Sequence, residues 1–360
     1  MKVVIDIGTM KTGTTARQEA MDRSRAELLE AGVLYLDGLG FNGNLLVHAV
    51  QDPDRVDLGR ARLAGAGGAE RVLSSVRQQI SGAPAHVHTA VLSCELYSQG
   101  LQRDSELSRL RGLLSPVTDE FQIACYLRGQ VEYATSFYSS LLRSGQTTSF
   151  AAFLDGCRPG RSTFDHLATV NRWARIFGDD AMALRVYERP SLVGGDIVTD
   201  FADLLGVSPS VLQGSSPSAS VNESLAPAGQ ALLRGLNTLP ATGRRPSDGT
   251  NSPLRRQCLQ VIEERFSGQP GNQPSERQAR EIERRFAVDN EVLRAKWFPE
   301  RPAMFVDYSP RPVSLEFGED FQAALAEILR LVHTVPGRWR SLSLRRLAGY
   351  PQWLLRRRRR

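Results

Sequence analysis

The chain has 360 residues, 41% of them hydrophobic and 23% charged, which is typical of a folded globular protein and excludes a chain dominated by disorder. Its net charge is +6, but nine arginines and no acidic residue lie in 331–360, so the residues before them carry 36 basic and 39 acidic side chains. The excess positive charge therefore belongs to a tail, and the body gives no indication of specific nucleic-acid binding.

Cysteine usage and hydropathy indicate a cytoplasmic protein. The four cysteines show neither CxxC pairs nor metal-ligand spacing: Cys94, Cys125, Cys157 and Cys258. They predict reduced thiols and no metal site. No run of 18 apolar residues occurs, and no signal peptide precedes the first strand, so we expect neither a membrane span nor export.

Strand-like and helix-like segments alternate along the first 190 residues. Apolar runs predict strands at 2–7, 32–36, 86–93, 121–128 and 183–188. Amphipathic patterns predict helices at 16–31, 58–80, 102–114 and 131–144, one more around Trp173 and Phe177, and a helix that carries His48. This alternation predicts a three-layer, P-loop-like α/β fold whose mostly parallel sheet is flanked by helices on both faces.

The second half of the chain predicts a helical C-terminal portion. Helical patterns occur at 254–266, 274–298 and 319–333, and no strand is predicted after Val207. Residues 238–253 are rich in Pro, Gly, Ser, Thr and Arg, which predicts a flexible loop. We expect one domain over 1–335 and an Arg-rich tail over 336–360. The tail is either a solvated end or, through its Trp and Leu residues, a peripheral contact for an anionic membrane or polyanion.

The segment Gly8–Thr15 (GTMKTGTT, here the 8–15 segment) joins the first strand to the first helix. A glycine turn at a helix N-terminus directs backbone N–H groups and the positive end of the helix dipole toward one point, which suits a phosphate or sulfate. In the common triphosphate loop the lysine follows the second glycine, whereas here Lys11 precedes Gly13. The segment therefore predicts an anion site for something other than a triphosphate.

Other polar side chains follow the predicted strands, where ligands bind in open α/β sheets. These are Glu95 after the third strand, Arg128 at the end of the fourth and Tyr187 near the end of the fifth. Arg128 and Ser136 lie eight residues apart, a spacing that lets a guanidinium and a hydroxyl converge on one anion. Taken singly, Arg128 also fits a surface charge and Ser136 a hydroxyl bonded to its own helix.

With these two motifs in this order, the chain resembles the sulfotransferases that use 3′-phosphoadenosine 5′-phosphosulfate (PAPS), in particular the bacterial branch with a Lys-Thr-Gly-Thr-Thr loop. Lys11–Thr15 is similar to the 5′-phosphosulfate loop of that family, while Arg128 and Ser136, followed by Tyr138, look like its 3′-phosphate site. The resemblance covers roughly residues 2–300, through 186–188, 200–206, 222–225 and 289–298, and does not extend into the tail.

The resemblance implies a set of donor-binding residues: Lys11, Thr12, Gly13, Thr14, Thr15, Arg128, Ser136 and Tyr187. In the family's pattern the lysine holds the bridging oxygen of the leaving group, and the loop amides with the hydroxyls of Thr14 and Thr15 bind the 5′-phosphate. Tyr187 resembles a tyrosine near the adenine. No metal is implied. A tryptophan of the eukaryotic cytosolic branch is replaced by Ala16, so stacking on the adenine is not expected at that position.

Two residues are candidates for the general base. Glu95 lies where heparan-type members of the family carry a catalytic glutamate, and His48 follows a glycine-rich segment, a pattern that recurs in the bacterial branch. Either side chain can take a proton from an acceptor hydroxyl. We favour Glu95.

The sequence thus predicts a PAPS-dependent sulfotransferase that acts on a hydroxyl or amine of a small molecule or glycan, with a carbohydrate or lipid-linked acceptor favoured. A P-loop kinase or other nucleotide-binding enzyme is one alternative, against which the position of Lys11 argues. The other alternative is a non-catalytic anion-binding module that docks through its basic tail.

Overall fold

The computed structural model describes residues 1–39, 43–55, 63–65, 67–118, 120–213, 224–239, 253–313 and 318–333. Contacts group the chain into two compact units. The first unit comprises Met1–Gln130, Arg158–Ala219 and Arg284–Asp307, and the second comprises Val131–Cys157, Ser220–Glu283 and Tyr308–Arg360. The expectation of one domain over 1–335 stays a prediction.

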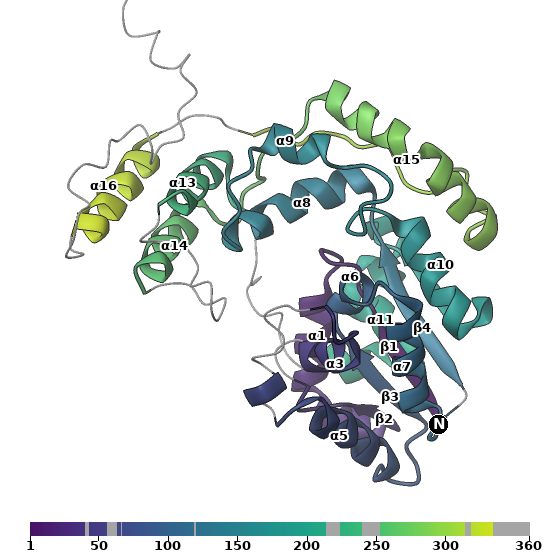
Figure 1. The fold of residues 1–360 in the computed structure, drawn as a ribbon. Coiled ribbons are helices and arrows are strands. Elements are labelled where there is room, and N and C mark those ends of the chain that lie inside the picture. Colours follow the sequence, from purple (N-terminus) through teal and green to yellow (C-terminus); the bar gives the residue numbers. More distant parts are fainter. Residues whose placement is uncertain are drawn as a thin grey trace, which may run out of the picture. The chain divides into compact units, whose positions relative to one another are not determined.

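The first unit is built on a five-stranded, all-parallel sheet of order β2-β3-β1-β4-β5 (Figure 1). The strands are β1 (Lys2–Asp6), β2 (Val33–Tyr35), β3 (Thr89–Ser93), β4 (Phe121–Leu127) and β5 (Met182–Val186). The central strands are nearly continuous apolar runs, as expected for a sheet covered on both faces. The predicted α/β fold is confirmed, and each of the five predicted strands is present.

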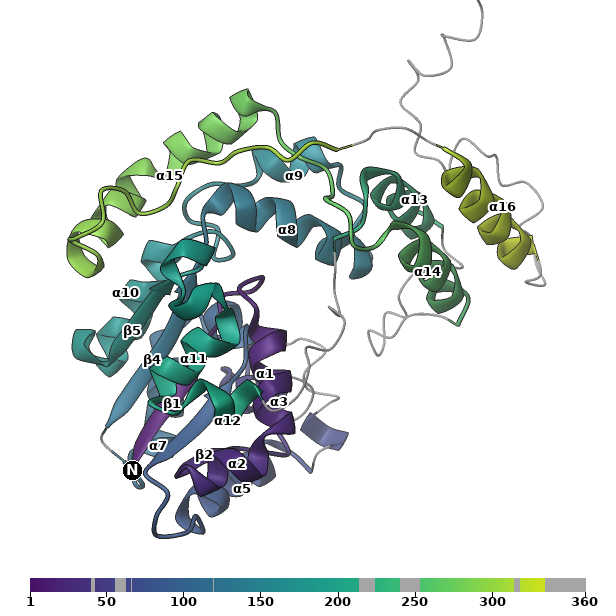
Figure 2. The ribbon, with the colours of Figure 1, turned by 180° about the vertical axis from the view of Figure 1, so that it is seen from behind.

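Helices cover both faces of this sheet. One face carries α3 (Asn44–Val50), α5 (Ala69–Ser81), α6 (Leu96–Gly100), α7 (Asp104–Leu114) and α10 (His166–Phe177). The opposite face, seen in Figure 2, carries α1 (Thr14–Arg23), α2 (Arg25–Glu30), α11 (Ile197–Leu205) and α12 (Pro209–Gln213). Short 3-10 turns lie at Asp179–Ala181, Arg189–Ser191 and Val193–Gly195. The sheet is therefore the middle of three layers.

Two predicted helices differ in the structure. The helix expected over 16–31 is divided into α1 and α2 at Ser24, a residue type that is less favourable in helix interiors than at helix starts. The helix expected over 58–80 is interrupted, because residues 63–65 are helical and α5 begins only after Gly67 and Gly68, both at positive φ. Residues 56–62 lie outside the described part of the chain.

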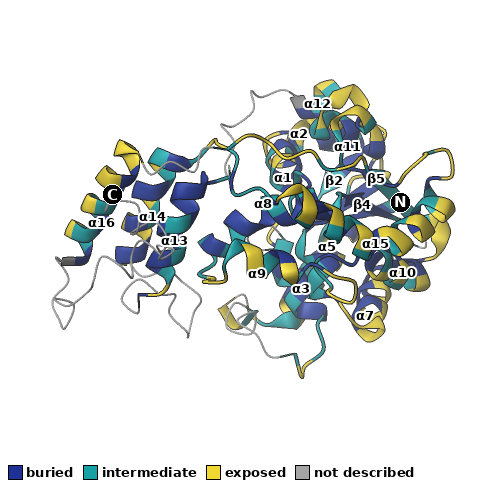
Figure 3. Cartoon of the chain, turned by 90° about the horizontal axis from the view of Figure 1, so that it is seen from above, coloured by how far each residue is buried: buried dark blue, intermediate teal, exposed yellow. Residues whose placement is uncertain are grey.

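The second unit is helical. It contains α8 (Gln130–Arg143) from Val131 on, α9 (Phe150–Asp155), α13 (Pro227–Asn237), α14 (Pro253–Phe266) and α16 (Glu319–His333). Apolar residues of α8, α13, α14 and α16 form one core cluster, and Figure 3 shows the dark blue buried residues on these helices. The long helix α15 (Glu276–Trp297) contributes residues to both units. The predicted helices at 254–266, 274–298 and 319–333 are confirmed, whereas α13 was not predicted.

The structure also bears on the predictions for the cysteines, for a membrane-spanning helix and for the loop and tail. All four cysteines are buried and free, as predicted. Among the described residues, no helix is both long and apolar enough to cross a bilayer. The loop predicted at 238–253 is described only at its ends, and the Arg-rich tail lies outside the described residues.

Candidate active site

The 8–15 segment follows β1 at the edge of the sheet where the carboxyl ends of the strands gather. Asp6 at the end of β1 is paired with Ser93 at the end of β3 and with Ala124 in β4. The chain leaves β1 toward β2 on one side of the sheet and leaves β4 toward β5 on the other side. Ligands of open α/β sheets bind at such a switch point, so this edge is the natural place for a site.

The backbone of the 8–15 segment needs two glycines. Gly8 and Gly13 have φ of 89° and 77°, in the left-handed region that side chains rarely adopt. A Cβ at Gly8 would lie 3.2 Å from the Cα of Glu95, and one at Gly13 would lie 3.0 Å from a side-chain carbon of Ile197. The segment is therefore packed between the chain after β3 and the start of α11. Lys11 also has a positive φ, of 61°.

The N-terminus of α1 is open to an anion. Its N-cap residue is Gly13, so no side chain caps the first turn, and that turn contains no acidic residue. The first N–H groups of a helix have no partner inside the helix, and the helix dipole adds positive potential there. Lys11 and Thr15 are half-buried beside this turn. The arrangement fits a phosphate or sulfate, as the sequence predicts.

Two threonine hydroxyls stabilise the segment itself. Thr12 Oγ1 donates to the carbonyl oxygen of Thr9 at 2.6 Å, and Thr14 Oγ1 lies 3.4 Å from the same oxygen. Both side chains are buried. The phosphate-binding role that the resemblance implies for the Thr14 hydroxyl stays a prediction, and Thr15 is the more accessible of the two hydroxyls.

A buried ion pair that the sequence did not reveal lies beneath the segment. Arg17 Nη2 and Nε donate to the two carboxylate oxygens of Asp6 at 2.9 and 3.2 Å, and both side chains are 0% exposed. Arg17 Nη1 also donates to the carbonyl oxygen of Thr12 at 2.7 Å, so the guanidinium joins β1 to the middle of the segment. Burial lowers the pKa of Arg17, but the adjacent Asp6 carboxylate raises it, and the net shift is upward. Arg17 therefore stays charged.

The ion pair belongs to a wider polar network. Ser93 Oγ donates to Asp6 at 2.8 Å, and the Arg17 guanidinium lies 4.4 Å from the centre of the Tyr126 ring. The Tyr126 hydroxyl donates to Asp200 on α11 at 2.7 Å. The network thus connects β1, α1, β3, β4 and α11 around the 8–15 segment. Its sequence signals are an aspartate that ends an apolar strand and an arginine on the buried side of the next helix.

Arg128 is fixed to the 8–15 segment. Its Nη1 donates to the carbonyl oxygen of Lys11 at 2.8 Å, and its guanidinium lies 5.3 Å from the centre of the Tyr187 ring. The imidazole Nε2 of His166 donates to the carbonyl oxygen of Arg128 at 2.7 Å, and burial lowers the pKa of His166, so that the ring is neutral. The structure therefore brings Lys11, Arg128 and Tyr187 together, as the sequence predicts. It adds His166, which no pattern in the sequence singles out.

Glu95 lies at the N-terminus of α6 and against the 8–15 segment. Burial raises the pKa of its carboxyl group, while the charges of Lys11 and Arg17 lower it, and the net shift is upward. A carboxylate with a raised pKa close to a lysine suits a general base beside an anion site.

His48, the other candidate base, is on α3. Its Nδ1 lies 3.2 Å from Gln51 Oε1, and Gln51 Nε2 donates to the carbonyl oxygen of Gly100. These contacts attach His48 to α6, whereas Glu95 lies against Gly8 and its carboxyl group responds to the charge of Lys11. The Glu95 carboxyl group is therefore electrostatically linked to Lys11.

Ser136 lies on α8 in the second unit and is half-buried. Arg128 belongs to the first unit, and the convergence of the two side chains stays a prediction. Among the described residues, no group of three or more His, Cys, Asp or Glu side chains could hold a metal ion.

Comparison with known proteins gave one distant structural likeness. No protein-family model and no curated protein matches the chain. The chain is similar to a solved structure of a sulfotransferase from Alicyclobacillus acidocaldarius, with 18% sequence identity, coverage of 61% of this chain and 84% of that chain, and a TM-score of 0.39. A likeness at this level carries no argument about activity, so the function is argued from the site.

Proposed function

We propose that this protein is a PAPS-dependent sulfotransferase that transfers a sulfuryl group to a hydroxyl or amine of a carbohydrate or lipid-linked acceptor. One observation carries the proposal. Lys11 precedes the uncapped start of α1, its carbonyl oxygen accepts a hydrogen bond from Arg128, and its charge acts on the carboxyl group of Glu95. This arrangement joins an anion cradle, a second anion-binding cation and a base.

The donor would be held at two places. The N–H groups at the start of α1 and the side chains of Lys11 and Thr15 would bind the 5′-phosphosulfate. Arg128 and, by the family resemblance, Ser136 would bind the 3′-phosphate. Tyr187 lies beside the Arg128 guanidinium, which supports a place for the adenine next to that phosphate.

The proposed step is an in-line transfer. A new bond forms between the acceptor oxygen and sulfur while the bond between sulfur and the bridging phosphate oxygen breaks, and its electron pair stays on the adenosine 3′,5′-bisphosphate. Lys11 would stabilise the charge that develops on the bridging oxygen, and Glu95 would accept the proton of the acceptor hydroxyl. Positioning and charge neutralisation would supply most of the rate, as in phosphoryl transfer.

The kinase alternative fits the site less well. The carboxylate at the end of β1, Asp6, is paired on both oxygens with Arg17 and is fully buried, so it is not open to a magnesium ion. Lys11 also precedes Gly13, where a triphosphate loop has its lysine after the second glycine.

Isothermal titration calorimetry with adenosine 3′,5′-bisphosphate tests the donor site. We expect binding without magnesium, and at least a tenfold weaker affinity for Lys11→Ala and for Arg128→Ala. Lys296→Ala is the matched control, because Lys296 is an exposed cation on α15 that pairs with Asp179. Equal affinity in all four proteins, or binding only of magnesium-ATP, would contradict the proposal.

Transfer of ³⁵S from labelled PAPS to a panel of hydroxyl and amine acceptors separates the enzyme from a non-catalytic module. The wild-type protein should transfer the label, and Glu95→Gln should bind the bisphosphate normally but lose transfer. Donor binding without transfer to any acceptor would favour the module instead.

A further inference from the structure

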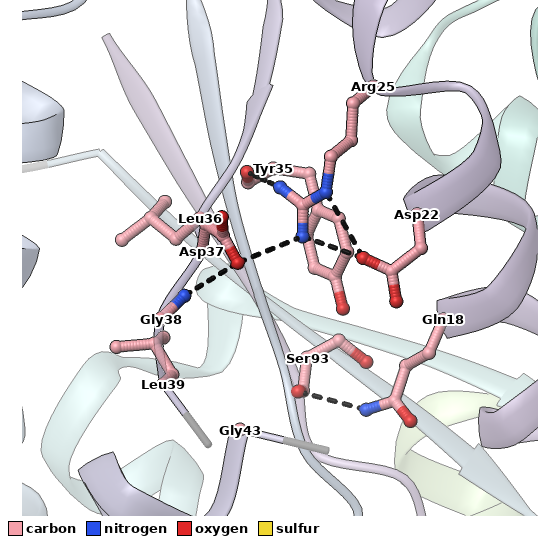
Figure 4. A pocket seen from close by; sticks show the side chains of 10 residues that line it. All are labelled: Gln18, Asp22, Arg25, Tyr35, Leu36, Asp37, Gly38, Leu39, Gly43 and Ser93. Atoms are coloured by element: carbon pink, nitrogen blue, oxygen red, sulfur yellow. Dashed lines mark hydrogen bonds and ion pairs between the residues drawn. The ribbon is translucent and has the colours of Figure 1, made fainter. Parts of the chain in front are cut away.

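A pocket lies beside α1, the helix that follows the 8–15 segment, and takes no part in the proposed donor site. It is lined mainly by polar side chains of α1, α2 and the ends of β2 and β3, among them Gln18, Asp22, Arg25, Tyr35, Asp37 and Ser93 (Figure 4). All of these residues belong to the first unit.

The inner end of the pocket lies about one helical turn from the start of α1, where the proposed donor site is. Gln18 lies four residues after Thr14 on α1, which is a rise of about 6 Å along the helix. Gln18 Nε2 donates to the carbonyl oxygen of Ser93 at 3.0 Å, and Ser93 precedes Glu95 by two residues. A ligand at this end therefore lies between the helix that begins at the anion site and the strand that leads to the proposed base.

Gln18 presents a hydrogen-bond acceptor to this pocket. The residue is only 4% exposed, and its Nε2 is engaged by Ser93. Its Oε1 makes no hydrogen bond within the described part of the chain, and Figure 4 shows the amide beside the pocket. A free amide oxygen at the wall of a pocket accepts a hydrogen bond from water or from a ligand.

The outer end of the pocket presents carboxylates rather than the guanidinium. Arg25 donates through Nε and Nη2 to Asp22 Oδ1 and through Nη1 to the carbonyl oxygen of Tyr35, and it lies over the Tyr35 ring at 4.5 Å. Its hydrogen bonds are thus taken up by Asp22 and by the backbone of β2. The side chains of Asp22 and Asp37 are 57% and 81% exposed, and Asp37 lies 3.7 Å from Arg25. The pocket therefore offers hydrogen-bond acceptors and one net negative charge.

We propose that this pocket is the acceptor subsite and that it selects a glycan of neutral or amino sugars. The inference rests on the proposed function, since it takes the 8–15 segment as the donor site. Sugar hydroxyls and ammonium groups donate hydrogen bonds, which Gln18, Asp22 and Asp37 can accept. A uronic or sulfated sugar would bring its own negative charge against Asp22 and Asp37, so the same carboxylates exclude it.

Calorimetry with three trisaccharides tests the subsite directly: an N-acetylglucosamine trimer, a glucosamine trimer and a galacturonic acid trimer. We expect the first two to bind and the third not to bind. The double variant Asp22→Asn/Asp37→Asn should bind the glucosamine trimer at least tenfold more weakly, and Gln18→Leu should weaken both ligands. Asp180→Asn is the control, because Asp180 is exposed just before β5, at the opposite edge of the sheet.

Binding of adenosine 3′,5′-bisphosphate, measured on the same proteins, separates the two claims. If the bisphosphate binds but none of the trimers does, or the galacturonic acid trimer binds as well as the glucosamine trimer, the subsite is wrong and the donor site stands. If unchanged saccharide affinities are found in the carboxylate and Gln18 variants, the subsite is also wrong. If the trimers bind as expected but the bisphosphate does not, the proposed function fails while the pocket remains a saccharide site.

Discussion

Two arginines on adjoining helices, α1 and α2, each pair with an aspartate, but the surroundings of the two pairs differ. Arg17 pairs with Asp6 and lies 4.4 Å from the Tyr126 ring centre, and Arg25 pairs with Asp22 and lies 4.5 Å from that of Tyr35. The first pair is 0% exposed on both sides, whereas the side chains of the second are 35% and 57% exposed.

The difference in burial decides what each pair does. In a buried pair each charge has lost its hydration, so removing one partner leaves the other charge buried without compensation. A surface pair stays hydrated and contributes little to stability. Arg17 and Asp6 therefore fix the 8–15 segment in one conformation. Arg25 and Asp22 can rearrange around a ligand at low cost, as a recognition surface requires.

The largest expected effect comes from breaking the buried pair. Asp6→Asn should lower the free energy of unfolding by about 3–5 kcal/mol, because the Arg17 charge would stay buried without its partner. Urea denaturation followed by circular dichroism measures this change. Asp22→Asn, the matched variant at the exposed pair, should cost less than about 1 kcal/mol. Equal losses in the two variants would contradict the comparison.

Glu95 lies against the 8–15 segment and should carry the pH dependence of the reaction. Because burial raises its pKa, kcat/KM should rise with pH along an acidic limb placed above the range of an exposed glutamate. Glu95→Gln should lose this limb and reduce kcat by about 10²- to 10⁴-fold. A limb that persists in Glu95→Gln would assign the base to another group, with His48 the first candidate.

Glu95→Gln should lower activity without lowering the stability of the fold. A carboxyl group whose pKa is higher in the folded state stabilises the fold at low pH, and this contribution is lost as the pH rises through the folded-state pKa. Thermal unfolding at neutral pH should therefore show Glu95→Gln to be at least as stable as the wild-type protein. A large loss of stability would mean that Glu95 is a structural residue.

Removing the hydroxyl of either tyrosine that packs against a guanidinium should change the free energy of unfolding by less than Asp6→Asn does. Tyr126→Phe removes the hydroxyl that donates to buried Asp200 and should cost about 1–3 kcal/mol. Tyr35→Phe keeps the ring under Arg25 and should change the free energy of unfolding by less than about 0.5 kcal/mol. The same urea experiment compares them, and a reversed order would place the structurally important network around Tyr35.

The smallest expected effect is that of salt on the stability contribution of the exposed Arg25–Asp22 pair. Raising the salt concentration should remove most of the stability difference between Asp22→Asn and the wild-type protein, because an exposed pair is screened by salt. The Asp6→Asn difference should persist at the same salt concentration. Equal salt sensitivity of both differences would mean that the Asp6 pair is accessible to solvent.

The sheet could be predicted from the sequence because its strands are apolar runs bounded by glycine and polar residues. The place of the candidate site could also be predicted, because parallel strands bring the residues that follow them to one edge of the sheet. These residues are the 8–15 segment, Glu95, Arg128 and Tyr187. The break at Ser24 could not be predicted, because the periodicity of α1 and α2 is continuous across it.

The support beneath the site was less accessible to sequence reasoning. Asp6 and Arg17 are eleven residues apart, and they pair only because α1 packs back against β1. The pocket combines Gln18 and Asp22 of α1 with Asp37 after β2 and Ser93 in β3. These side chains meet through the packing of the three layers, a property that local patterns in the chain do not express.

The central claim is that the start of α1 binds the 5′-phosphosulfate. The most direct measurement is a titration of the ¹⁵N-labelled protein with adenosine 3′,5′-bisphosphate, followed by TROSY spectra of the backbone amides. We predict large downfield proton shifts for Gly13, Thr14 and Thr15, because their N–H groups would donate to the phosphate. Saturable binding that leaves these three amides unmoved would contradict the account.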